Sequence, residues 1–275
     1  MEGLSSRLKA VVSHSQSLLK RLKEYERLCE NPVDNAFGRG RSLAAFDASV
    51  QEFPDSELKS ELGRWLVEER ARVAKDQEEF RYQFGTRFAS ALTEHGLRAK
   101  GQMPVLRVGM FSVRLDLAAG KASVYWGPEV ELLKSGLPLR PNELAETLSR
   151  WTSDLKAKAT EPQKMRKSLS DAYHRACGAL GVEEGSRILL ADALAELVML
   201  LQPKGFRQDP ARARFVEYPR VRFSYDLFRL RAEPGTMRLH VANFDATLEK
   251  SRAIWVPDNE EGEGTYYSYV SFGGQ

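Results

Sequence analysis

Cationic and aromatic side chains are concentrated between Lys204 and Arg231. This stretch holds eight cations and three carboxylates, a net charge of +5, so the rest of the chain sums to −2 against a total of +3. The cations are Lys204, Arg207, Arg212, Arg214, Arg220, Arg222, Arg229 and Arg231. The interleaved aromatic residues are Phe206, Phe215, Tyr218, Phe223, Tyr225 and Phe228. Guanidinium groups bind phosphate and aromatic faces stack on bases, so the composition predicts a nucleic-acid-binding surface.

Apolar and polar residues alternate within this stretch, which predicts a β-strand that would present the cations in a row. Val221, Phe223 and Tyr225 share one expected face, whereas Arg220 and Arg222 share the other. The phase changes after residue 227, and a bulge there would keep the later cations on the same side. Two alternatives stay open: an ordinary solvated sheet face, or a surface for an acidic protein.

Carboxylates near the centre of the chain suggest a second chemistry. Nucleases with two carboxylates and a lysine around magnesium place these groups on a β-hairpin. Asp116 lies on an expected hairpin and is followed by Glu129, Glu131 and Lys134. The lysine comes one position too late for that motif, and Pro128 interrupts the strand. A divergent magnesium-dependent nuclease is therefore the second alternative.

Other residues that could bind a metal, bind a phosphate or take part in catalysis do not form a known motif. His174 and Cys177 are three apart on an expected helix, but further ligands with suitable spacing are missing, so no metal site is predicted. The glycine-rich segment 38–42 lacks the spacing of a phosphate-binding loop, and we interpret it as a turn with Ser42 as a helix cap. No serine elbow, kinase motif or paired-cysteine motif occurs. We predict no cofactor, leave the catalytic residues unknown, and favour a non-enzymatic role.

The composition excludes several classes of protein. With 275 residues, 42% hydrophobic and 29% charged, the chain is expected to be globular rather than disordered. Its longest apolar stretch, 188–201, is interrupted by Asp192 and Glu196, so no membrane span is predicted. The N-terminus lacks the pattern of a secretory signal, and two cysteines far apart form no disulfide framework. A cytoplasmic location is the expectation.

The first thirty residues have an apolar seam with alternating steps of four and three, which is typical of a heptad helix. Its members are Leu4, Leu8, Val11, Ser15, Leu18, Leu22, Tyr25 and Cys29. Such a helix must bury its stripe against another helix. We therefore predict coiled-coil character and contact with a protein partner, or with a second copy of the chain, through Leu4, Leu8, Val11, Leu18, Leu22 and Tyr25.

The remaining elements predict an α+β fold in three parts. Residues 1–96 are expected to form a helical hairpin, with a loop at 31–42, a short helix at 43–53 and a long helix to 94, bent near Gly63 and Gly85. Residues 97–158 are expected to form a β-hairpin, from one strand over 105–115, and a helix over 143–157. Residues 159–275 are expected to form a helix over 161–179, a helix ending at 202, and strands over 213–231, 237–245, 250–256 and 265–272.

These observations favour a non-catalytic subunit of a multi-protein assembly that binds the nucleic-acid backbone with the basic β face. A protein-only adaptor is the first alternative. The acidic segment 258–263 is expected to neutralise the basic face within the fold, or to cover it until a partner displaces it.

Overall fold

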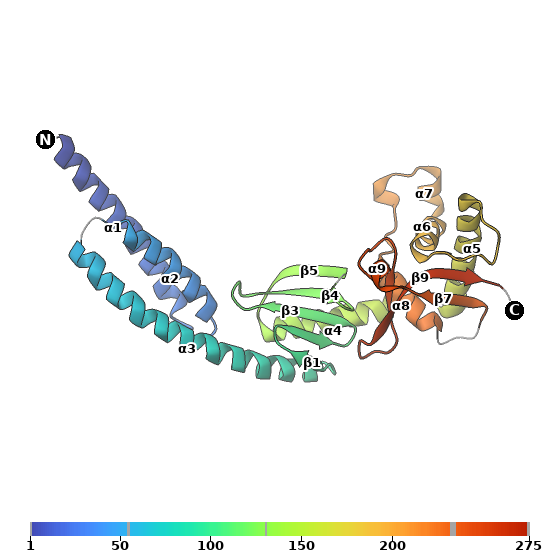
Figure 1. Ribbon diagram of the computed structural model, residues 1–275, viewed down its shortest axis with the longest axis horizontal. Coiled ribbons are helices and arrows are strands. Elements are labelled where there is room, and N and C mark those ends of the chain that lie inside the picture. The colour runs from blue at the N-terminus through green and yellow to red at the C-terminus, as the bar shows by residue number, and fades with distance from the viewer. Residues whose placement is uncertain (1, 54–55, 130, 232–234, 274–275) are drawn as a thin grey trace. The chain divides into compact units, whose positions relative to one another are not determined.

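Helices and antiparallel sheets make up the chain, which confirms the predicted α+β fold (Figure 1). The computed structural model describes residues 2–53, 56–129, 131–231 and 235–273, with only the backbone at 2–4, 6, 7 and 56. The chain divides into two compact units. One unit holds the residues up to Glu94 together with 115–122 and 136–145, and the other holds 95–114, 123–135 and the residues from Glu146 onward.

Three helices form the N-terminal part of the first unit: α1 (Glu2–Leu28), α2 (Ala36–Gln51) and α3 (Ser56–Glu94). Helix α2 packs against both α1 and α3. Their shared core consists of Leu18, Tyr25, Leu43, Phe46, Val50, Phe53, Leu66 and Val73. The expected helices to residue 28 and to residue 94 are confirmed, and the parts of their apolar stripes that this core contains are buried within the chain.

Helix α3 is continuous over its 39 residues, so neither Gly63 nor Gly85 interrupts it. Figure 1 shows that the helix curves along its length, and a bend at these two glycines stays a prediction. A glycine within a helix costs about 1 kcal/mol relative to alanine. Three buried phenylalanines at intervals of four stabilise this part of the helix: the rings of Phe80 and Phe84 lie 5.8 Å apart, and those of Phe84 and Phe88 lie 5.5 Å apart. Their packing outweighs the glycine cost.

Residues 38–42 belong to α2, so the predicted turn with a cap at Ser42 is also wrong. The glycines here serve close helix packing instead. A Cβ atom at Gly40 would lie 2.8 Å from the amide nitrogen of Gln77 on α3, and one at Gly38 would touch Leu28 on α1. Arg39 lies between them and points into the three-helix core, where it is 4% exposed.

A buried polar network surrounds Arg39. Its guanidinium lies 2.8 Å from Glu69 and also binds Asp76, and it donates to the Tyr25 hydroxyl at 3.2 Å. The Tyr25 hydroxyl donates to Glu69 at 2.6 Å. Buried charges are stable only when paired and hydrogen-bonded, so this network accounts for a charged residue in the helical core.

Five strands pair in chain order into one sheet. They are β1 (Ala99–Gln102), β2 (Val105–Val108), β3 (Phe111–Asp116), β4 (Lys121–Trp126) and β5 (Glu131–Pro138). The single strand predicted over 105–115 is in fact two strands. Gly109, with a φ of +54°, reverses the chain so that Val108 pairs with Phe111. The predicted hairpin between β3 and β4 is confirmed, and α4 (Pro141–Lys158) follows the sheet.

The C-terminal elements build a second sheet and its helical cover. Strand β9 (Gly264–Phe272) pairs antiparallel with β6 (Ile188–Leu189), β7 (Met237–Val241) and β8 (Ile254–Pro257). The helices are α5 (Pro162–Leu180), α6 (Leu190–Leu200) and the short α9 (Phe244–Thr247). The predicted start of α5 is confirmed, because Glu161 caps it by accepting hydrogen bonds from the amides of Gln163 and Lys164. Helix α9 occupies the end of the strand predicted over 237–245.

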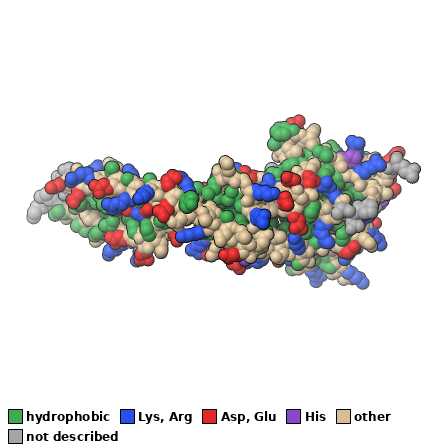
Figure 2. Space-filling view, turned by 90° about the horizontal axis from the view of Figure 1, so that it is seen from below, with side chains coloured by type: hydrophobic (Ala, Val, Ile, Leu, Met, Phe, Trp, Pro, Cys, Tyr) green, Lys and Arg blue, Asp and Glu red, His purple; other side chains and the backbone are tan. Residues whose placement is uncertain are grey.

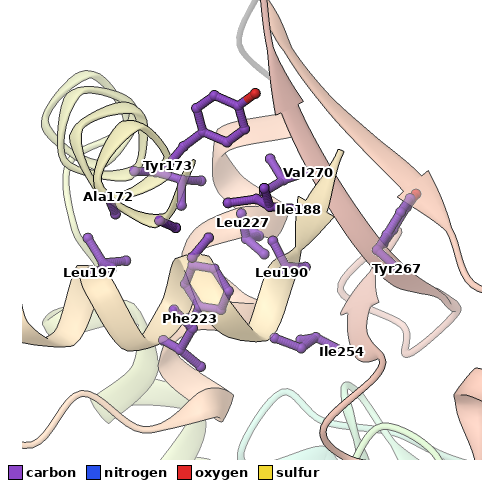
Figure 3. Close-up of a cluster of buried hydrophobic side chains, with 14 of the residues drawn as sticks. Ala172, Tyr173, Ile188, Leu190, Leu197, Phe223, Leu227, Ile254, Tyr267 and Val270 are labelled. Atoms are coloured by element: carbon purple, nitrogen blue, oxygen red, sulfur yellow. The ribbon is translucent and has the colours of Figure 1, made fainter. Parts of the chain in front are cut away.

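A hydrophobic core joins these helices to β9. Tyr173 of α5, Leu197 of α6 and Val270 of β9 belong to this core together with Phe223 and Leu227 (Figure 3). The Tyr173 hydroxyl donates to the carbonyl of residue 186 at 2.7 Å, so its polar end is satisfied. None of the described helices is long and apolar enough to cross a membrane.

Candidate nucleic-acid interface

The stretch from Lys204 to Arg231 is helical. It contains α7 (Lys204–Gln208), the 3-10 helix η1 (Arg212–Arg214) and α8 (Arg220–Arg231). The strand predicted over 213–231, its bulge and its basic β face are therefore wrong. Phe223, Leu227 and Leu230 are buried at steps of four and three, the spacing of one helix face, and their packing overrides the alternation of residues 221–227.

The first half of this stretch, residues 203–217, is named the basic arm. In Figure 1 the segment around α7 stands out from the neighbouring α6. The buried side chain of Gln202 closes its base: its amide nitrogen donates to the carbonyl of Val216 at 3.0 Å, and its oxygen accepts from the Val216 amide at 2.9 Å. The same nitrogen also donates to the carbonyl of Val198 in α6 at 2.8 Å. The basic arm is thus a closed, compact loop of the Ω type.

Four of the predicted cations are exposed on the basic arm: Lys204, Arg207, Arg212 and Arg214. Arg214 pairs with Asp209 at 2.9 Å, and Arg207 donates to the carbonyl of Leu200 at 2.6 Å. Within the part of the chain that the structure describes, the side chains of Lys204 and Arg212 make no ion pair or hydrogen bond. These positive charges are available to an external anion.

The basic arm also carries aromatic and apolar surface. The rings of Phe206 and Phe215 lie 5.5 Å apart in an edge-to-face pair, and Phe215 is 38% exposed. On the face shown in Figure 2, Lys and Arg side chains are interspersed with Asp and Glu, in keeping with a net charge of only +3. The arm is therefore a local concentration of cations beside an accessible ring, which is the combination that single-stranded nucleic acid binds.

The four predicted cations of α8 have partners inside the chain. Arg220 lies 3.4 Å from Glu131 and donates to the carbonyl of residue 253 at 2.8 Å. Arg229 donates to the carbonyl of Thr160 at 3.3 Å. Arg231 pairs with Asp258 at 2.7 Å. The guanidinium of the fourth, Arg222, lies over the ring of Tyr218.

A buried cluster around Asp226 fixes α8 in place. Asp226 accepts hydrogen bonds from the amide and the hydroxyl of Thr160, at 2.8 and 2.7 Å, and from the Tyr218 hydroxyl at 2.6 Å. Burial, followed by the neighbouring Asp226 charge, raises the pKa of Tyr218, so the phenol keeps the proton that it donates. The Arg222 guanidinium lies 5.0 Å from the centre of the Tyr218 ring. Because Asp226 has these three donors, we assign the cluster a structural role.

The acidic segment between β8 and β9 contacts basic side chains of several elements. Asp258 binds Arg231, Glu260 lies 3.0 Å from Lys156, and Glu261 lies 3.1 Å from Lys100. Burial alone would raise the pKa of Asp258, but hydrogen bonds from Arg231 and Thr265 hold it below its usual range. Only one of these three basic partners belongs to the stretch from 204 to 231.

The seam of α1 is divided between the core and the surface. Leu18 and Tyr25 are buried in the three-helix core, Leu22 packs against it, and Val11 is half-buried. Leu8 is 65% exposed. The side chain of Leu4 lies outside the described part of the chain. The structure therefore accounts for burial of the central and C-terminal seam inside the chain, while contact with another protein stays a prediction.

The carboxylates considered for a nuclease have other partners. Asp116 accepts the amide of residue 119 at 2.8 Å, and Glu129 pairs with Arg114 at 2.7 Å. Glu131 lies between Arg220 and Lys250, at 3.4 and 3.2 Å. Among the described residues, no three His, Cys, Asp or Glu side chains converge to hold a metal ion.

The remaining candidate residues of the sequence analysis are dispersed. His174 pairs with Glu184 at 3.0 Å, Cys177 is buried in the core, and both Cys177 and Cys29 are free thiols.

One group of cations was missed in the sequence. Arg98, Lys100, Arg107 and Arg114 lie in a segment, 95–115, that contains no carboxylate. The absence of carboxylates from this segment was the signal from which a second basic site could have been predicted, although its net charge is smaller than that of residues 204–231.

No protein-family model, no curated protein and no solved structure matches this chain.

Proposed function

We propose that this protein binds the phosphate backbone of nucleic acid through the basic arm, as a non-catalytic subunit of a larger assembly. The observation that carries the proposal is the exposure of Lys204, Arg207, Arg212 and Arg214 on one clamped loop, with a single carboxylate partner among them at Asp209. Phosphate contacts of this kind hold a nucleic acid without reading its sequence.

The arm suits this role better than α8 does, because a cation already paired within the fold must break that contact to bind phosphate. On the arm, only Arg207 and Arg214 have such contacts, and both contacts are solvent-exposed. Arg220, Arg229 and Arg231 each bind an oxygen atom of the chain. Lys204 and Arg212 have no such bond to lose among the described residues. We therefore assign the direct phosphate contacts to the arm rather than to α8.

Preorganisation supports the proposal further. The Gln202 clamp ties both ends of the arm to α6, so the loop does not have to be ordered on binding. Ordering a flexible segment would cost about 1 to 2 kcal/mol per residue. A nearby ring at Phe215 offers a stacking face for an unpaired base, which favours single strands over duplexes.

The decisive experiment measures binding of a fluorescently labelled single strand by anisotropy at low salt. The test variant is Lys204→Glu/Arg212→Glu, which reverses two exposed charges that have no internal partner. We expect it to weaken binding at least about tenfold. The slope of the logarithm of the association constant against the logarithm of salt concentration should decrease by the amount expected for the loss of about two phosphate contacts.

The matched control is Lys20→Glu/Lys23→Glu, which makes the same change of charge at two exposed positions of α1. It should leave binding within about twofold of the unmodified protein, because these two lysines lie outside the arm and the proposal assigns the direct phosphate contacts to the arm's own cations. Equal losses of affinity in both variants would show that the arm contributes only through the overall charge of the protein. Absence of binding to the unmodified protein at low salt would refute the proposal and favour the protein-only adaptor.

A further inference from the structure

A pocket of about 600 Å³ lies within the second unit, between the β1–β3 strands, α4 and the β8–β9 loop. This volume falls in the range of about 300 to 1,000 Å³ that small-molecule sites occupy. Its lining shares no residue with the basic arm. The basic residues Arg98, Lys100, Arg107 and Lys156 line it, together with Glu260 and Glu261.

The pocket has an excess of positive charge, and the β8–β9 loop partly neutralises it. Glu260 lies 3.0 Å from Lys156, and Glu261 lies 3.1 Å from Lys100. These pairs leave Arg98 and Arg107 without a carboxylate partner among the described residues. The loop carboxylates thus already occupy the place that an external anion would take at the two lysines.

Arg107 is the centre of this excess charge. Its side chain is half-buried, and its guanidinium donates to the carbonyl of residue 262 at 2.6 Å. Burial lowers the pKa of Arg107, because desolvation disfavours the cation and no carboxylate lies close enough to offset that effect. An anion entering the pocket would supply the missing charge, and the guanidinium fork matches the oxygens of a phosphate.

Aromatic side chains line the same pocket beside the cations. Phe111 and Trp126 form an edge-to-face pair with ring centres 5.6 Å apart, and Tyr225 also lines the pocket, but these side chains are only 3%, 2% and 5% exposed, so the pocket reaches their edges alone. The indole nitrogen of Trp126 donates to the Ser224 hydroxyl at 2.8 Å, which fixes the ring. The accessible apolar side chains of the lining are Leu97 and Leu155, which are half-buried. A ligand with an apolar planar ring and an anionic group would complement these leucines and the neighbouring cations.

We propose that the pocket binds a small phosphate-bearing molecule with a planar ring, such as a mononucleotide. The phosphate binds Arg98 and Arg107, and the ring packs against the half-buried side chains of Leu97 and Leu155. Glu260 and Glu261 are internal competitors for the neighbouring lysines. This site is separate from the basic arm and does not depend on its function.

The loop is a weak competitor, which leaves the pocket accessible. Both of its ion pairs are solvent-exposed, and exposed pairs contribute little to stability. The Asn259 side chain accepts the amides of Glu261 and Glu263 at 3.0 and 3.2 Å, and Arg231 binds Asp258. The glutamate side chains can therefore move away from the lysines while the loop backbone keeps its place.

The test is isothermal titration of the whole protein with adenosine 5′-monophosphate, inorganic pyrophosphate, citrate and adenosine. We expect the monophosphate to bind most tightly, since it alone offers both the phosphate and the ring. Binding of pyrophosphate as tight as that of the monophosphate would overturn the ring part of the proposal. Equal binding of citrate or of uncharged adenosine would overturn the phosphate part, and no binding of any probe at millimolar concentration would overturn the site.

Three variants locate the binding. Arg98→Gln and Arg107→Gln should each weaken monophosphate binding at least tenfold, and Glu260→Gln/Glu261→Gln should strengthen it severalfold by removing the competitors. Arg114→Gln is the matched control, since this exposed arginine of β3 pairs with Glu129 and does not line the pocket.

A loss in the control equal to that in Arg98→Gln, or weaker binding after removal of the two carboxylates, would overturn the proposal. If Arg107→Gln does not fold, Arg98→Gln and the double glutamate variant decide the result. Oligonucleotide binding by these variants should stay unchanged, which separates this test from that of the basic arm.

Discussion

Replacing Arg39 with methionine should strongly destabilise the three N-terminal helices. Arg39 is 4% exposed and Glu69 is 6% exposed, so the pair is shielded from water. Methionine fills much of the same volume but removes the charge, and the Glu69 carboxylate would keep only Tyr25 and Arg72 as partners. Removing one member of a buried ion pair costs about 3 to 5 kcal/mol.

Two further variants make this prediction quantitative. Arg39→Met/Glu69→Met removes both buried charges and should recover much of the lost stability, because the remaining carboxylate partner of Arg39, Asp76, is 23% exposed and can be solvated. Arg72→Met is the matched control: Arg72 binds the same Glu69 at 3.0 Å but is exposed, so its loss should cost less than about 1 kcal/mol. Urea denaturation followed by far-UV circular dichroism measures all three, and hydrogen exchange locates the effect in α1–α3.

The pH dependence supplies an independent check. Burial alone raises the pKa of Glu69, but hydrogen bonds from Tyr25 and Arg39 and the charge of Arg39 outweigh it and leave the pKa lowered. Glu69 therefore stabilises the fold above its unfolded pKa of about 4.3, and this contribution is lost as the pH falls through the lower folded value. Without Arg39, burial would raise the pKa of Glu69, so the stability gap between Arg39→Met and the unmodified protein should narrow on acidification. A loss below about 1 kcal/mol at neutral pH, or a gap that widens in acid, would refute this reasoning.

Three other substitutions test the fold around the proposed site. Gln202→Ala removes the clamp and should cost about 1 to 3 kcal/mol, with faster amide exchange across the basic arm; unchanged exchange there would contradict the clamp. Phe223→Ala should lower the free energy of unfolding by about 3 to 5 kcal/mol in urea denaturation, whereas the exposed Phe215→Ala should cost about 1 kcal/mol or less; equal losses would contradict the placement of α8 in the core. Gly127→Ala should lower the thermal midpoint, because the new Cβ would lie 2.4 Å from the Trp255 ring at a φ of +60°; an unchanged midpoint would show that this contact is looser than described.

Elements with a single, uninterrupted hydrophobic period could be predicted from the sequence. Helices α1 and α3 follow steps of three and four over many turns, and β3 and β4 flank a turn that contains Gly120. Helix α8 was missed because its aromatic and β-branched residues fit a strand locally. Its conformation depends on Tyr173, Leu197 and Val270, which are distant in sequence and pack around Phe223.

The concentration of charge between 204 and 231 was visible in the sequence, but the partners of each cation were not. Arg220 binds Glu131 and Arg231 binds Asp258, and only the folded chain brings these pairs together. Arg39 shows the same limit, since glycines on either side of it suggested a turn while the fold uses them for helix packing. Local composition therefore indicated where the charge lies, whereas long-range contacts determine which charges are free.

The most direct test of nucleic-acid binding by the basic arm is the salt dependence of single-strand affinity. If Lys204, Arg207, Arg212 and Arg214 each contact a phosphate, the logarithm of the association constant should fall against the logarithm of salt concentration with a slope of about −3. Lys204→Glu/Arg212→Glu should reduce that slope to about −1.5, and Lys20→Glu/Lys23→Glu should leave it unchanged. A slope near zero, or one that the arm variant does not alter, would contradict the proposed function.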